Sequence, residues 1–371
     1  MKILFVDNER WSQYNFRGFV IEELVKLGHE IVCLAPSDDN DKLIKKLGTK
    51  AVNINLDRKG INIFKDIYLL FQLFLIYRKE KPDLIFHYTI KPNIYGSIVA
   101  KFLKIKCISI IPGLGYTFLK KSPLTIIVKI LYKISLKKVF LILVLNRDDK
   151  LELIKNNISS SNKIDILPSE GIDTKKFKPL KMARKDKNIV FLMVARILWD
   201  KGFKEYVEAA KIIKQNYKNV EFRLLGPIDH GNPSAVKKEE VLKYHKNKTI
   251  DYLGTSQDIP NIIKECDCFV LPSYYREGIP RTLLEAAAME KPIITTKSIG
   301  CKEVVDDGIN GFLCNTRSSE DLVKKIEIFL NLAKDEKIIM GKKGRIKVMK
   351  EFDKEIVLKH YIEIIGNLEK L

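Results

Sequence analysis

Short apolar runs alternate with amphipathic stretches along the whole chain. The first run spans residues 2–6, and a helical pattern of apolar positions follows from residue 16 to residue 27, with Gly28 at a C-cap position. The next run, residues 31–35, completes a βαβ unit, which requires parallel strands. Further strand-length runs, separated by helical patterns, occupy residues 51–56, 84–88, 107–111, 139–145, 189–195, 221–225, 250–253, 269–271 and 293–296. The alternation predicts an α/β fold with doubly wound parallel sheets.

The chain is long enough for two such sheets. Its 371 residues exceed one ordinary hydrophobic core, and 46% apolar residues allow two well-packed domains. Amphipathic helices are expected over residues 320–332, 335–351 and 353–368, whereas the polar, lysine-rich residues 228–248 are predicted to form a mobile excursion. No G-x-G-x-x-G follows the first strand, so the dinucleotide-binding fingerprint is absent.

One strand, loop and helix in the second half carries candidate chemistry. The apolar run 269–271 is stopped by Pro272, and a turn-like segment leads through Pro280 into a helical pattern. Glu277 then lies on the loop and Glu285 in the second turn of the helix. The free N–H groups of a helix start attract anions, and the two carboxylates can accept hydrogen bonds from sugar hydroxyls. This stretch suits a ligand with both phosphates and hydroxyls.

A second loop offers cations for the same kind of ligand. Arg196 and Lys201 follow the predicted strand 189–195 and are closed by Gly202 before a helix. An arginine and a lysine five residues apart at a strand end can clamp a diphosphate. The alternative is two solvated cations without a ligand.

Glu277 and Glu285 stand in a longer recognisable context. They are followed by Ala286 and by Lys-Pro-Ile-Ile at residues 291–294, and together these resemble the E-x7-E signature of retaining glycosyltransferases of family 4, which have the two-domain GT-B fold. A bare glutamate pair at this spacing also occurs on solvated helix faces. The longer context favours the family.

Further segments extend the resemblance over essentially the whole chain. Residues 299–305 and 306–313 are similar to the family's G-x-x-E-x-v and d-G-x-n-G-f-l blocks, and residues 167–179 are similar to the segment that ends the first GT-B domain. The match is strongest over residues 189–313.

The resemblance implies two Rossmann-like domains that face a central cleft. Residues 1–172 would form an acceptor-binding, membrane-associating domain, and residues 173–352 would bind the nucleotide sugar. Residues 353–371 would form a helix that returns to the first domain.

The family pattern also assigns roles in donor binding. Arg196 and Lys201 would hold the diphosphate, Glu277 the hydroxyls of the donor sugar and Glu285 the ribose, so that Glu277, Arg196 and Lys201 form the catalytic set. The expected donor-binding residues are Arg196, Lys201, Gly254, Ser256, Glu277, Gly278, Ile279, Pro280, Arg281, Leu283 and Glu285. No D-x-D motif stands at a convincing strand end, which agrees with transfer that needs neither a metal nor another cofactor.

Acceptor contacts are expected on three loops of the first half. Asn-Phe-Arg at residues 15–17 and Gly-Leu-Gly-Tyr at residues 113–116 resemble segments of bacterial capsule and O-antigen transferases, and residues 87–93 follow another strand. No carboxylate stands next to the second segment. Two alternatives remain open, because Arg17 could merely cap a helix and His87 could be a core histidine. The expected acceptor-binding residues are Asn15, Phe16, Arg17, His87, Lys91, Gly113, Leu114, Gly115 and Tyr116.

The charge distribution points to an anionic surface. The formal net charge is +20, and no acidic residue lies between Asp83 and Asp148. Lys129, Lys133 and Lys137 recur every four residues in an otherwise apolar helical pattern that begins near Pro123. A second apolar helix pattern, residues 67–77, is too short to span a bilayer. Both helices are predicted to lie on anionic lipid, although ordinary core helices with solvated lysines remain the alternative.

Nucleic-acid binding would account for the charge less well. It would add a helix-turn-helix, an aromatic RNA-binding strand or zinc-ligand spacing, and the sequence contains none of these patterns.

The six cysteines are scattered and are expected to be reduced, mostly buried thiols. The N-terminus enters a strand directly, so no signal peptide is expected. The expected location is the cytoplasmic face of the bacterial inner membrane, with peripheral or monotopic attachment.

The resemblance implies a specific reaction class. The acceptor loops and basic helices are similar to those of bacterial enzymes that extend polyprenyl-diphosphate-linked glycans in protein N-glycosylation, capsule or O-antigen assembly. Among these, N-acetylgalactosaminyltransferases imply UDP-N-acetylgalactosamine, or another UDP-N-acetylhexosamine, as donor. The alternatives are a UDP-sugar epimerase of GT-B fold and a non-catalytic sugar-nucleotide-binding protein at the membrane surface.

Overall fold

A seven-stranded parallel sheet organises the first half of the chain. Its strands run in the order β3-β2-β1-β4-β5-β6-β7. The strands are β1 (Lys2–Val6), β2 (Glu30–Ala35), β3 (Lys50–Asn53), β4 (Leu84–Tyr88), β5 (Lys106–Ile111), β6 (Leu141–Val144) and β7 (Ile164–Ile166). The registers place Ile3 beside Ile31 and Leu84, and Leu4 beside Val32 and Ile85. Because successive residues of a strand point to opposite faces, the central strands are apolar on both faces. Such continuous apolar runs form parallel strands because helices cover both faces of the sheet.

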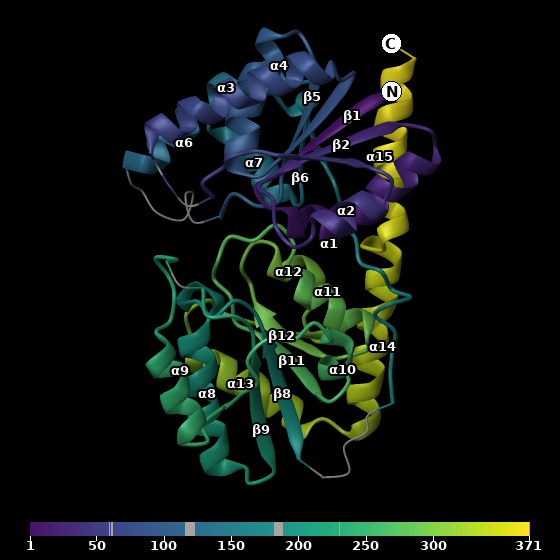
Figure 1. Cartoon of the computed structure of the whole chain (residues 1–371). Coiled ribbons are helices and arrows are strands. Elements are labelled where there is room, and N and C mark those ends of the chain that lie inside the picture. Colours follow the sequence, from purple (N-terminus) through teal and green to yellow (C-terminus); the bar gives the residue numbers. More distant parts are fainter. Residues whose placement is uncertain (59, 61, 116–122, 182–187, 230, 371) are drawn as a thin grey trace. The chain divides into compact units, whose positions relative to one another are not determined.

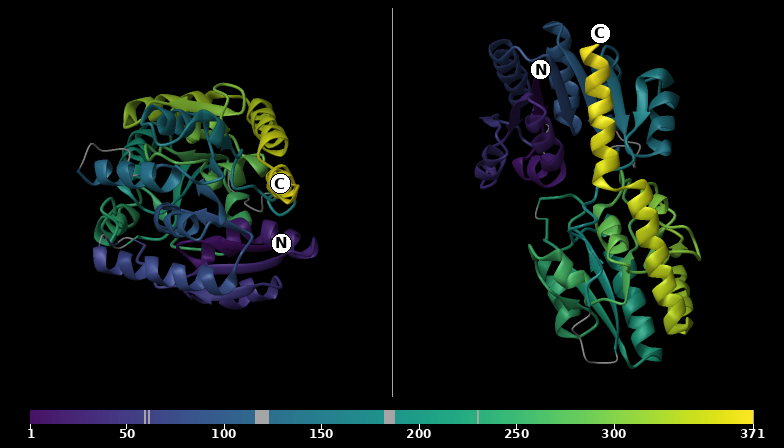
Figure 2. Two further views of the ribbon diagram at one scale, coloured as in Figure 1. Left: turned by 90° about the horizontal axis from the view of Figure 1, so that it is seen from above. Right: turned by 90° about the vertical axis from the view of Figure 1, so that its right-hand side faces the viewer.

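The computed structural model describes all residues except 59, 61, 116–122, 182–187, 230 and 371. Helices cover both faces of the seven-stranded sheet (Figures 1 and 2). Leu4 of β1 shares a core cluster with Leu69 of α3 (Ile63–Glu80). Phe5 lies on the opposite face and packs at a tilt against Phe86, which contacts Tyr361 of α15 (Lys354–Glu369). The helices are α1 (Arg10–Lys26), α2 (Asp41–Lys46), α3 (Ile63–Glu80), the π-helical turn η1 (Pro92–Gly96), α4 (Ser97–Phe102), α6 (Pro123–Leu136), α7 (Arg147–Lys155), the 3-10 turn η2 (Ser161–Lys163) and α15 (Lys354–Glu369).

A six-stranded parallel sheet organises the second half, in the order β10-β9-β8-β11-β12-β13. The strands are β8 (Ile189–Val194), β9 (Val220–Leu225), β10 (Asp251–Tyr252), β11 (Cys268–Leu271), β12 (Ile293–Thr296) and β13 (Gly311–Cys314). The helices are the 3-10 turn η3 (Trp199–Lys201), α8 (Phe203–Asn216), α9 (Lys238–Lys246), α10 (Ile259–Ile263), α11 (Arg281–Ala288), α12 (Cys301–Val304), α13 (Ser319–Asn331) and α14 (Lys334–Glu351).

The chain divides into two compact units. Unit 1 comprises Met1–Gly171 and Lys354–Leu371, and unit 2 comprises Ile172–Asp353. The C-terminal helix α15 belongs to unit 1, where the Tyr361 hydroxyl lies 2.9 Å from the hydroxyl of Tyr88 at the end of β4. All six cysteines are buried free thiols.

Three local predictions were wrong. The first helix begins at Arg10 rather than at residue 16, because buried polar side chains such as Arg10 and Gln13 hide its inner face from an apolar count. Residues 228–248 are not one irregular excursion, since Lys238–Lys246 form α9 with Val241 buried against the core. Strand β7, only three residues long, was not predicted.

Membrane spanning was not expected for the apolar helices. Across the part of the chain that the structure describes, no helix combines the length and the apolar content needed to cross a bilayer.

Candidate functional site

The loop between β11 and α11 is fixed from two sides in unit 2. The backbone carbonyl of Asp200 accepts hydrogen bonds from the N–H groups of Tyr274, at 3.0 Å, and Tyr275, at 2.9 Å. On the other side, Ser298 Oγ donates to the Ser273 carbonyl at 2.9 Å. The loop therefore holds its side chains in place before any ligand binds.

Two glycines allow neighbouring loops to approach this closely. Gly202 has φ +84°, and a Cβ there would lie 2.2 Å from the Pro272 carbonyl oxygen. Gly300 also has φ +84°, and its Cβ would lie 2.2 Å from the Gly278 carbonyl oxygen. Because only glycine fits both the backbone conformation and the space, these positions set the shape of the loop.

Lys201 and Glu277, both of which were predicted to bind the donor, meet at this loop. The Lys201 ammonium forms an ion pair with Glu277 Oε1, and both side chains are largely buried. Ser273 Oγ donates to the same carboxylate oxygen at 3.1 Å, and the Lys201 ammonium lies 5.2 Å from the centre of the Tyr275 ring. A cation and a hydrogen-bonding carboxylate are thus presented together at the carboxyl end of the sheet, where ligands of open α/β sheets bind.

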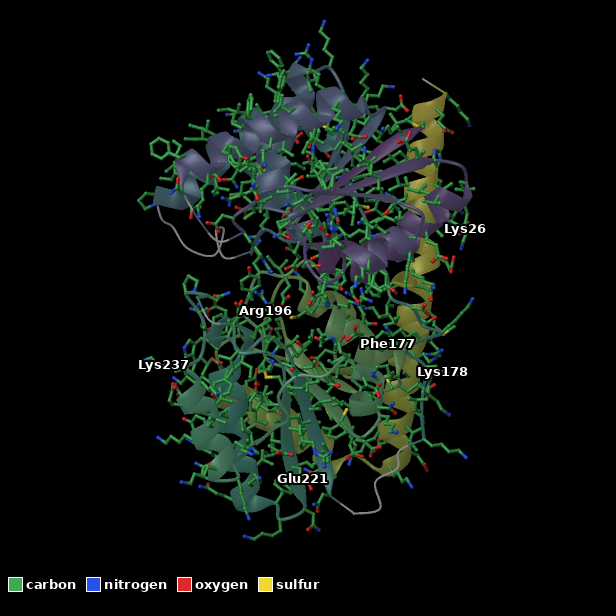
Figure 3. All side chains as sticks on the ribbon, viewed as in Figure 1. Lys26, Phe177, Lys178, Arg196, Glu221 and Lys237 are labelled. Carbon is green, nitrogen blue, oxygen red and sulfur yellow. The ribbon has the colours of Figure 1, made fainter. Side chains whose placement is uncertain are left out.

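Arg196 occupies the neighbouring strand end, after β8 (Figure 3). Its Nη1 donates to Asp229 Oδ2 at 3.0 Å, and the side chains are 36% and 16% exposed. Asn232 Nδ2 donates to the same oxygen at 3.1 Å. The predicted diphosphate clamp therefore consists of two cations that each already hold a carboxylate partner.

Glu285 lies in the second turn of α11, as predicted. Its Oε1 accepts from Arg281 Nε at 3.1 Å. Burial raises the pKa of the Glu285 carboxyl, and the neighbouring Arg281 acts in the opposite direction. The pair joins one helical turn to the next at the N-terminal end of α11.

Among the remaining donor candidates, Gly254 and Ser256 follow β10, and the others lie on the loop between β11 and α11 or on α11 itself. The Gly254 carbonyl accepts from the Gly226 N–H at 2.8 Å, and Gly254 has φ +72°. Ser256 is exposed, and its Oγ accepts from the Asp258 N–H at 3.0 Å. The other candidates of the loop and of α11 differ in burial: Gly278, Pro280 and Leu283 are buried, and Ile279 is half-buried.

Unit 1 uses the Asn-Phe-Arg segment differently from the prediction. Residues 14–18 lie inside α1 rather than on a loop. Arg17 is 4% exposed, pairs with Glu170 at 2.8 Å and with Asp7 at 3.6 Å, and covers the Tyr88 ring at 4.4 Å. Burial raises the pKa of Asp7 to about 6, and Arg17 opposes this shift. Arg17 is a buried structural cation because its charge is matched within the unit.

The neighbouring candidates of this segment are only half-buried. Asn15 Nδ2 donates to the Trp11 carbonyl at 3.0 Å, and the Phe16 ring packs edge-on against the Trp11 ring.

His87 is a core histidine. It is fully buried, with Nε2 2.9 Å from the Tyr77 hydroxyl and Nδ1 3.2 Å from Ser97 Oγ. Burial lowers its pKa to about 3, so the ring is neutral at physiological pH. Of the two alternatives for His87, the structure favours the core position.

Lys91 and the Gly-Leu-Gly segment complete the predicted acceptor set. Lys91 Nζ donates to Asp66 Oδ1 at 2.5 Å, and Tyr95 donates to Asp66 Oδ2 at 2.8 Å. Leu114 is buried between the half-buried Gly113 and Gly115. Tyr116 lies outside the described residues.

A hollow that the sequence did not reveal lies at the carboxyl ends of β2 and β3. Its volume is about 460 Å³. Its polar lining consists of Ser37, Asn53, Asn55, Asp57, Lys65 and Tyr68. No short motif marks these positions, because they come from two strand ends and the first turns of α3.

Comparison with known proteins identifies the family. The family described as "Glycosyl transferases group 1" matches residues 174–347, and "Glycosyl transferase 4-like" matches residues 2–146. A Campylobacter jejuni protein named N,N′-diacetylbacillosaminyl-diphospho-undecaprenol alpha-1,3-N-acetylgalactosaminyltransferase is 30% identical over 387 aligned positions, covering 100% of both chains. The chain belongs to the same glycosyltransferase family as this Campylobacter protein. Membership favours sugar transfer over the epimerase and non-catalytic alternatives.

One further relative agrees with this membership, and two solved structures agree with the fold. An Escherichia coli protein named UDP-Gal:alpha-D-GlcNAc-diphosphoundecaprenol alpha-1,3-galactosyltransferase is 29% identical over 312 positions, covering 80% of this chain and 78% of its own. A solved glycosyltransferase from Rickettsia africae superposes with a TM-score of 0.82 at 21% identity, covering 100% of this chain and 98% of its own. Anabaena HepE, solved with UDP-glucose, superposes with a TM-score of 0.81 at 17% identity, covering 99% of this chain and 100% of its own. The predicted GT-B fold is confirmed.

Two residues of this candidate site were missed by the sequence prediction. Asp229 and Ser273 contact the predicted cation and carboxylate, yet neither stood out as a ligand-binding residue. Ser273 could have been found from its position at the end of β11, two residues before Tyr275. Asp229 lies in the segment expected to be a mobile excursion, and only the fold brings it to Arg196.

Proposed function

We propose that the protein transfers a sugar from a UDP-sugar to a polyprenyl-diphosphate-linked saccharide in bacterial glycan assembly. The observation that carries the donor half is the Lys201–Glu277 pair on the fixed loop between β11 and α11. The names of the Campylobacter and Escherichia relatives both contain a diphospho-undecaprenol acceptor, which supports the acceptor class. N-acetylgalactosamine, or another N-acetylhexosamine, is the proposed donor sugar.

The proposed reaction breaks the bond between the anomeric carbon and the diphosphate oxygen. Negative charge grows on the leaving diphosphate, and fixed cations that face it lower the barrier. Arg196 and Lys201 would supply this charge without a metal. Glu277 would hold hydroxyls of the donor sugar, and Glu285 would accept from the ribose.

The acceptor hydroxyl would attack on the face that the diphosphate leaves. Its oxygen forms the new bond to the anomeric carbon, and its proton passes to the departing phosphate oxygen. This front-face displacement balances without a protein base and retains the anomeric configuration. It is consistent with the absence of a carboxylate from residues 112–116.

We infer a membrane-facing surface on unit 1, formed by α3, α4 and α6. These three helices pack against one another or against η1 (Figure 1). The surface exposes many large apolar side chains: Ile63, Phe64, Ile67, Phe71, Leu75, Phe102, Ile126, Ile127, Ile130 and Ile134. Phe64 is 78% exposed and Phe102 75%.

Lysines accompany this surface. Lys133 of α6 is exposed, and Lys137 and Lys138 directly after the helix are exposed as well, whereas Lys129 donates to Asn156 at 2.8 Å. Exposed apolar side chains beside cations match the interface of an anionic bilayer. The proposed location is therefore the cytoplasmic face of the bacterial inner membrane, with peripheral or monotopic attachment.

Sedimentation with vesicles tests this surface. Ile130→Glu should lower binding to vesicles that contain phosphatidylglycerol by at least tenfold, because burying a charge at the interface is unfavourable. Ile328→Glu, at a similarly exposed isoleucine on α13 of unit 2, is the matched control and should bind like the wild type. Equal loss in both variants would contradict the assignment of the surface to unit 1.

Transfer by Glu277 variants tests the donor site. Glu277→Ala should reduce transfer to a polyprenyl-diphosphate-linked monosaccharide by about 100-fold or more, while the circular-dichroism spectrum and vesicle binding stay close to wild type. Glu239→Ala, which removes an exposed carboxylate from α9 of the same unit, is the control and should transfer like the wild type. Unchanged transfer by Glu277→Ala would refute the role assigned to Glu277.

A further inference from the structure

The strand ends beside the hollow at β2 and β3 are joined by hydrogen bonds. Arg10 is fully buried beneath the strand ends, and its Nη2 donates to the carbonyls of Ala35, at 3.1 Å, and Val52, at 3.0 Å. The Ser37 N–H donates to Asn53 Oδ1 at 2.9 Å. One guanidinium thus joins the ends of β2 and β3, and the turn after β2 is tied to β3.

The outer wall is also fixed by hydrogen bonds. The Asn55 N–H donates to Gln72 Oε1 at 3.0 Å, which ties the segment after β3 to α3. Lys65 Nζ donates to Asp57 Oδ2 at 3.0 Å, and Asp57 Oδ1 accepts from the Gly60 N–H at 2.9 Å. The hollow is therefore built from held segments, although its polar side chains face solvent.

Its lining has the composition that carbohydrate recognition requires. The space is surrounded by the carboxamides of Asn53 and Asn55, the hydroxyl of Ser37, the carboxylate of Asp57 and the ammonium of Lys65. Together these groups can donate hydrogen bonds to sugar hydroxyls and accept hydrogen bonds from them. Tyr68 is 51% exposed and offers a flat apolar ring on which a sugar face can pack. A volume of about 460 Å³ falls in the range of small-molecule sites.

The hollow adjoins the membrane-facing surface through α3. Lys65 and Tyr68 line the hollow, and the neighbouring Phe64, Ile67 and Phe71 are exposed large apolar residues. The proposed acceptor consists of a lipid chain, a diphosphate and a sugar. The lipid chain needs an apolar surface, the diphosphate needs cations, and the sugar needs a polar hollow, in that order along the molecule. The first turns of α3 present these three chemistries side by side.

We propose that this hollow binds the saccharide of the acceptor, with Asn55 and Tyr68 as its recognition residues. The inference rests on the proposed function and specifies its acceptor half. It also replaces part of the acceptor set predicted from the sequence, because Arg17 and His87 are buried and engaged within unit 1.

Kinetics with a short-chain acceptor test the assignment. The acceptor is an N-acetylhexosamine diphosphate ester with a short, water-soluble prenyl chain, so that membrane binding does not contribute. Asn55→Ala and Tyr68→Leu should each raise the acceptor KM about fivefold, through loss of a hydrogen bond or of ring packing, and leave the donor KM unchanged. Asn162→Ala, at an exposed asparagine in η2, is the matched control and should behave like the wild type.

A binding experiment separates this inference from the proposed reaction. Saturation-transfer NMR with the methyl glycoside of N-acetylglucosamine reports saccharide binding whether or not transfer occurs. A wild-type signal that Tyr68→Leu abolishes supports the hollow, even if no transfer is found and the proposed function fails. Transfer by the wild type, with an unchanged acceptor KM and an unchanged NMR signal in both variants, would overturn the hollow and leave the proposed function standing.

Discussion

The Arg196–Asp229 pair predicts that one substitution should strengthen donor binding. If Arg196 holds the donor diphosphate, the Asp229 carboxylate competes with that ligand and also repels it. Asn232 steadies the carboxylate through a 3.1 Å hydrogen bond. Asp229→Asn removes the charge and keeps an oxygen that can still accept from Asn232, so the local fold should persist.

The expected size follows from the geometry of the pair. The two charged atoms lie 3.0 Å apart, but Arg196 is 36% exposed, so water screens their attraction. Pairs of this kind are worth at most about 1 kcal/mol, and about 0.5–1 kcal/mol corresponds to a twofold to fivefold change in a dissociation constant. Asp229→Asn should therefore lower the Kd for UDP about twofold to fivefold.

Calorimetric titration with UDP measures this change directly. The gain should be larger at low ionic strength, because salt screens both the ion pair and the repulsion. Asp251→Asn removes the same charge from a more exposed aspartate of unit 2 that lies 3.5 Å from His245, and it should leave the Kd unchanged. Weaker binding by Asp229→Asn would show that Asp229 orients Arg196 for the ligand, and the competition argument would be wrong.

Three further predictions concern catalysis, packing and pH. Lys201→Ala should lower kcat about 100-fold with little change in Tm, and an unchanged kcat would remove Lys201 from the catalytic set. Gly300→Ala should lower the free energy of unfolding by at least about 1–2 kcal/mol in denaturant titrations, because its Cβ would meet the Gly278 carbonyl at 2.2 Å. Gly366→Ala in α15, with open space around its Cβ, should be neutral or stabilising, and equal losses in both variants would contradict the packing argument. Burial lowers the pKa of His87 to about 3, so between pH 6.5 and pH 3 the unfolded chain binds more protons than the folded chain. The contribution of His87 to the free energy of unfolding therefore falls as the pH falls. His87→Asn should weaken the pH dependence of stability, and an identical pH profile in the variant and the wild type would refute this assignment.

The sheets could be predicted well from the sequence, because parallel strands covered on both faces are continuous apolar runs. The run at residues 84–88 coincides with β4, and the runs at 2–6 and 293–296 coincide with β1 and β12. Strand β7 escaped because three residues at a sheet edge give too little apolar pattern.

The loop between β11 and α11 could also be predicted, because its residues directly follow one strand in the sequence. Glu277 lies on a short loop that directly follows β11, so the strand position alone brings it to the carboxyl end of the sheet. Its partner Lys201 follows β8, the neighbouring strand, for the same reason.

The predicted acceptor residues show where sequence reasoning ends. Arg17 and His87 have side chains that suit a binding site, but their burial depends on Glu170 and Tyr77, which are distant in sequence or lie on another element. The Asn-Phe-Arg segment was expected on a loop because buried polar side chains masked the start of α1. A pattern of residue types cannot distinguish a cation that meets a ligand from one that meets a buried carboxylate.

The most direct test of the proposed function is transfer from a panel of UDP- and GDP-sugars to a polyprenyl-diphosphate-linked monosaccharide. The assay contains EDTA and measures released nucleotide and the mass of the lipid product, and NMR assigns the new anomeric centre. We predict that one UDP-N-acetylhexosamine yields a lipid product with the donor's anomeric configuration in the presence of EDTA. An inverted anomer, or nucleotide release without a lipid product, would contradict the proposed mechanism or the proposed acceptor.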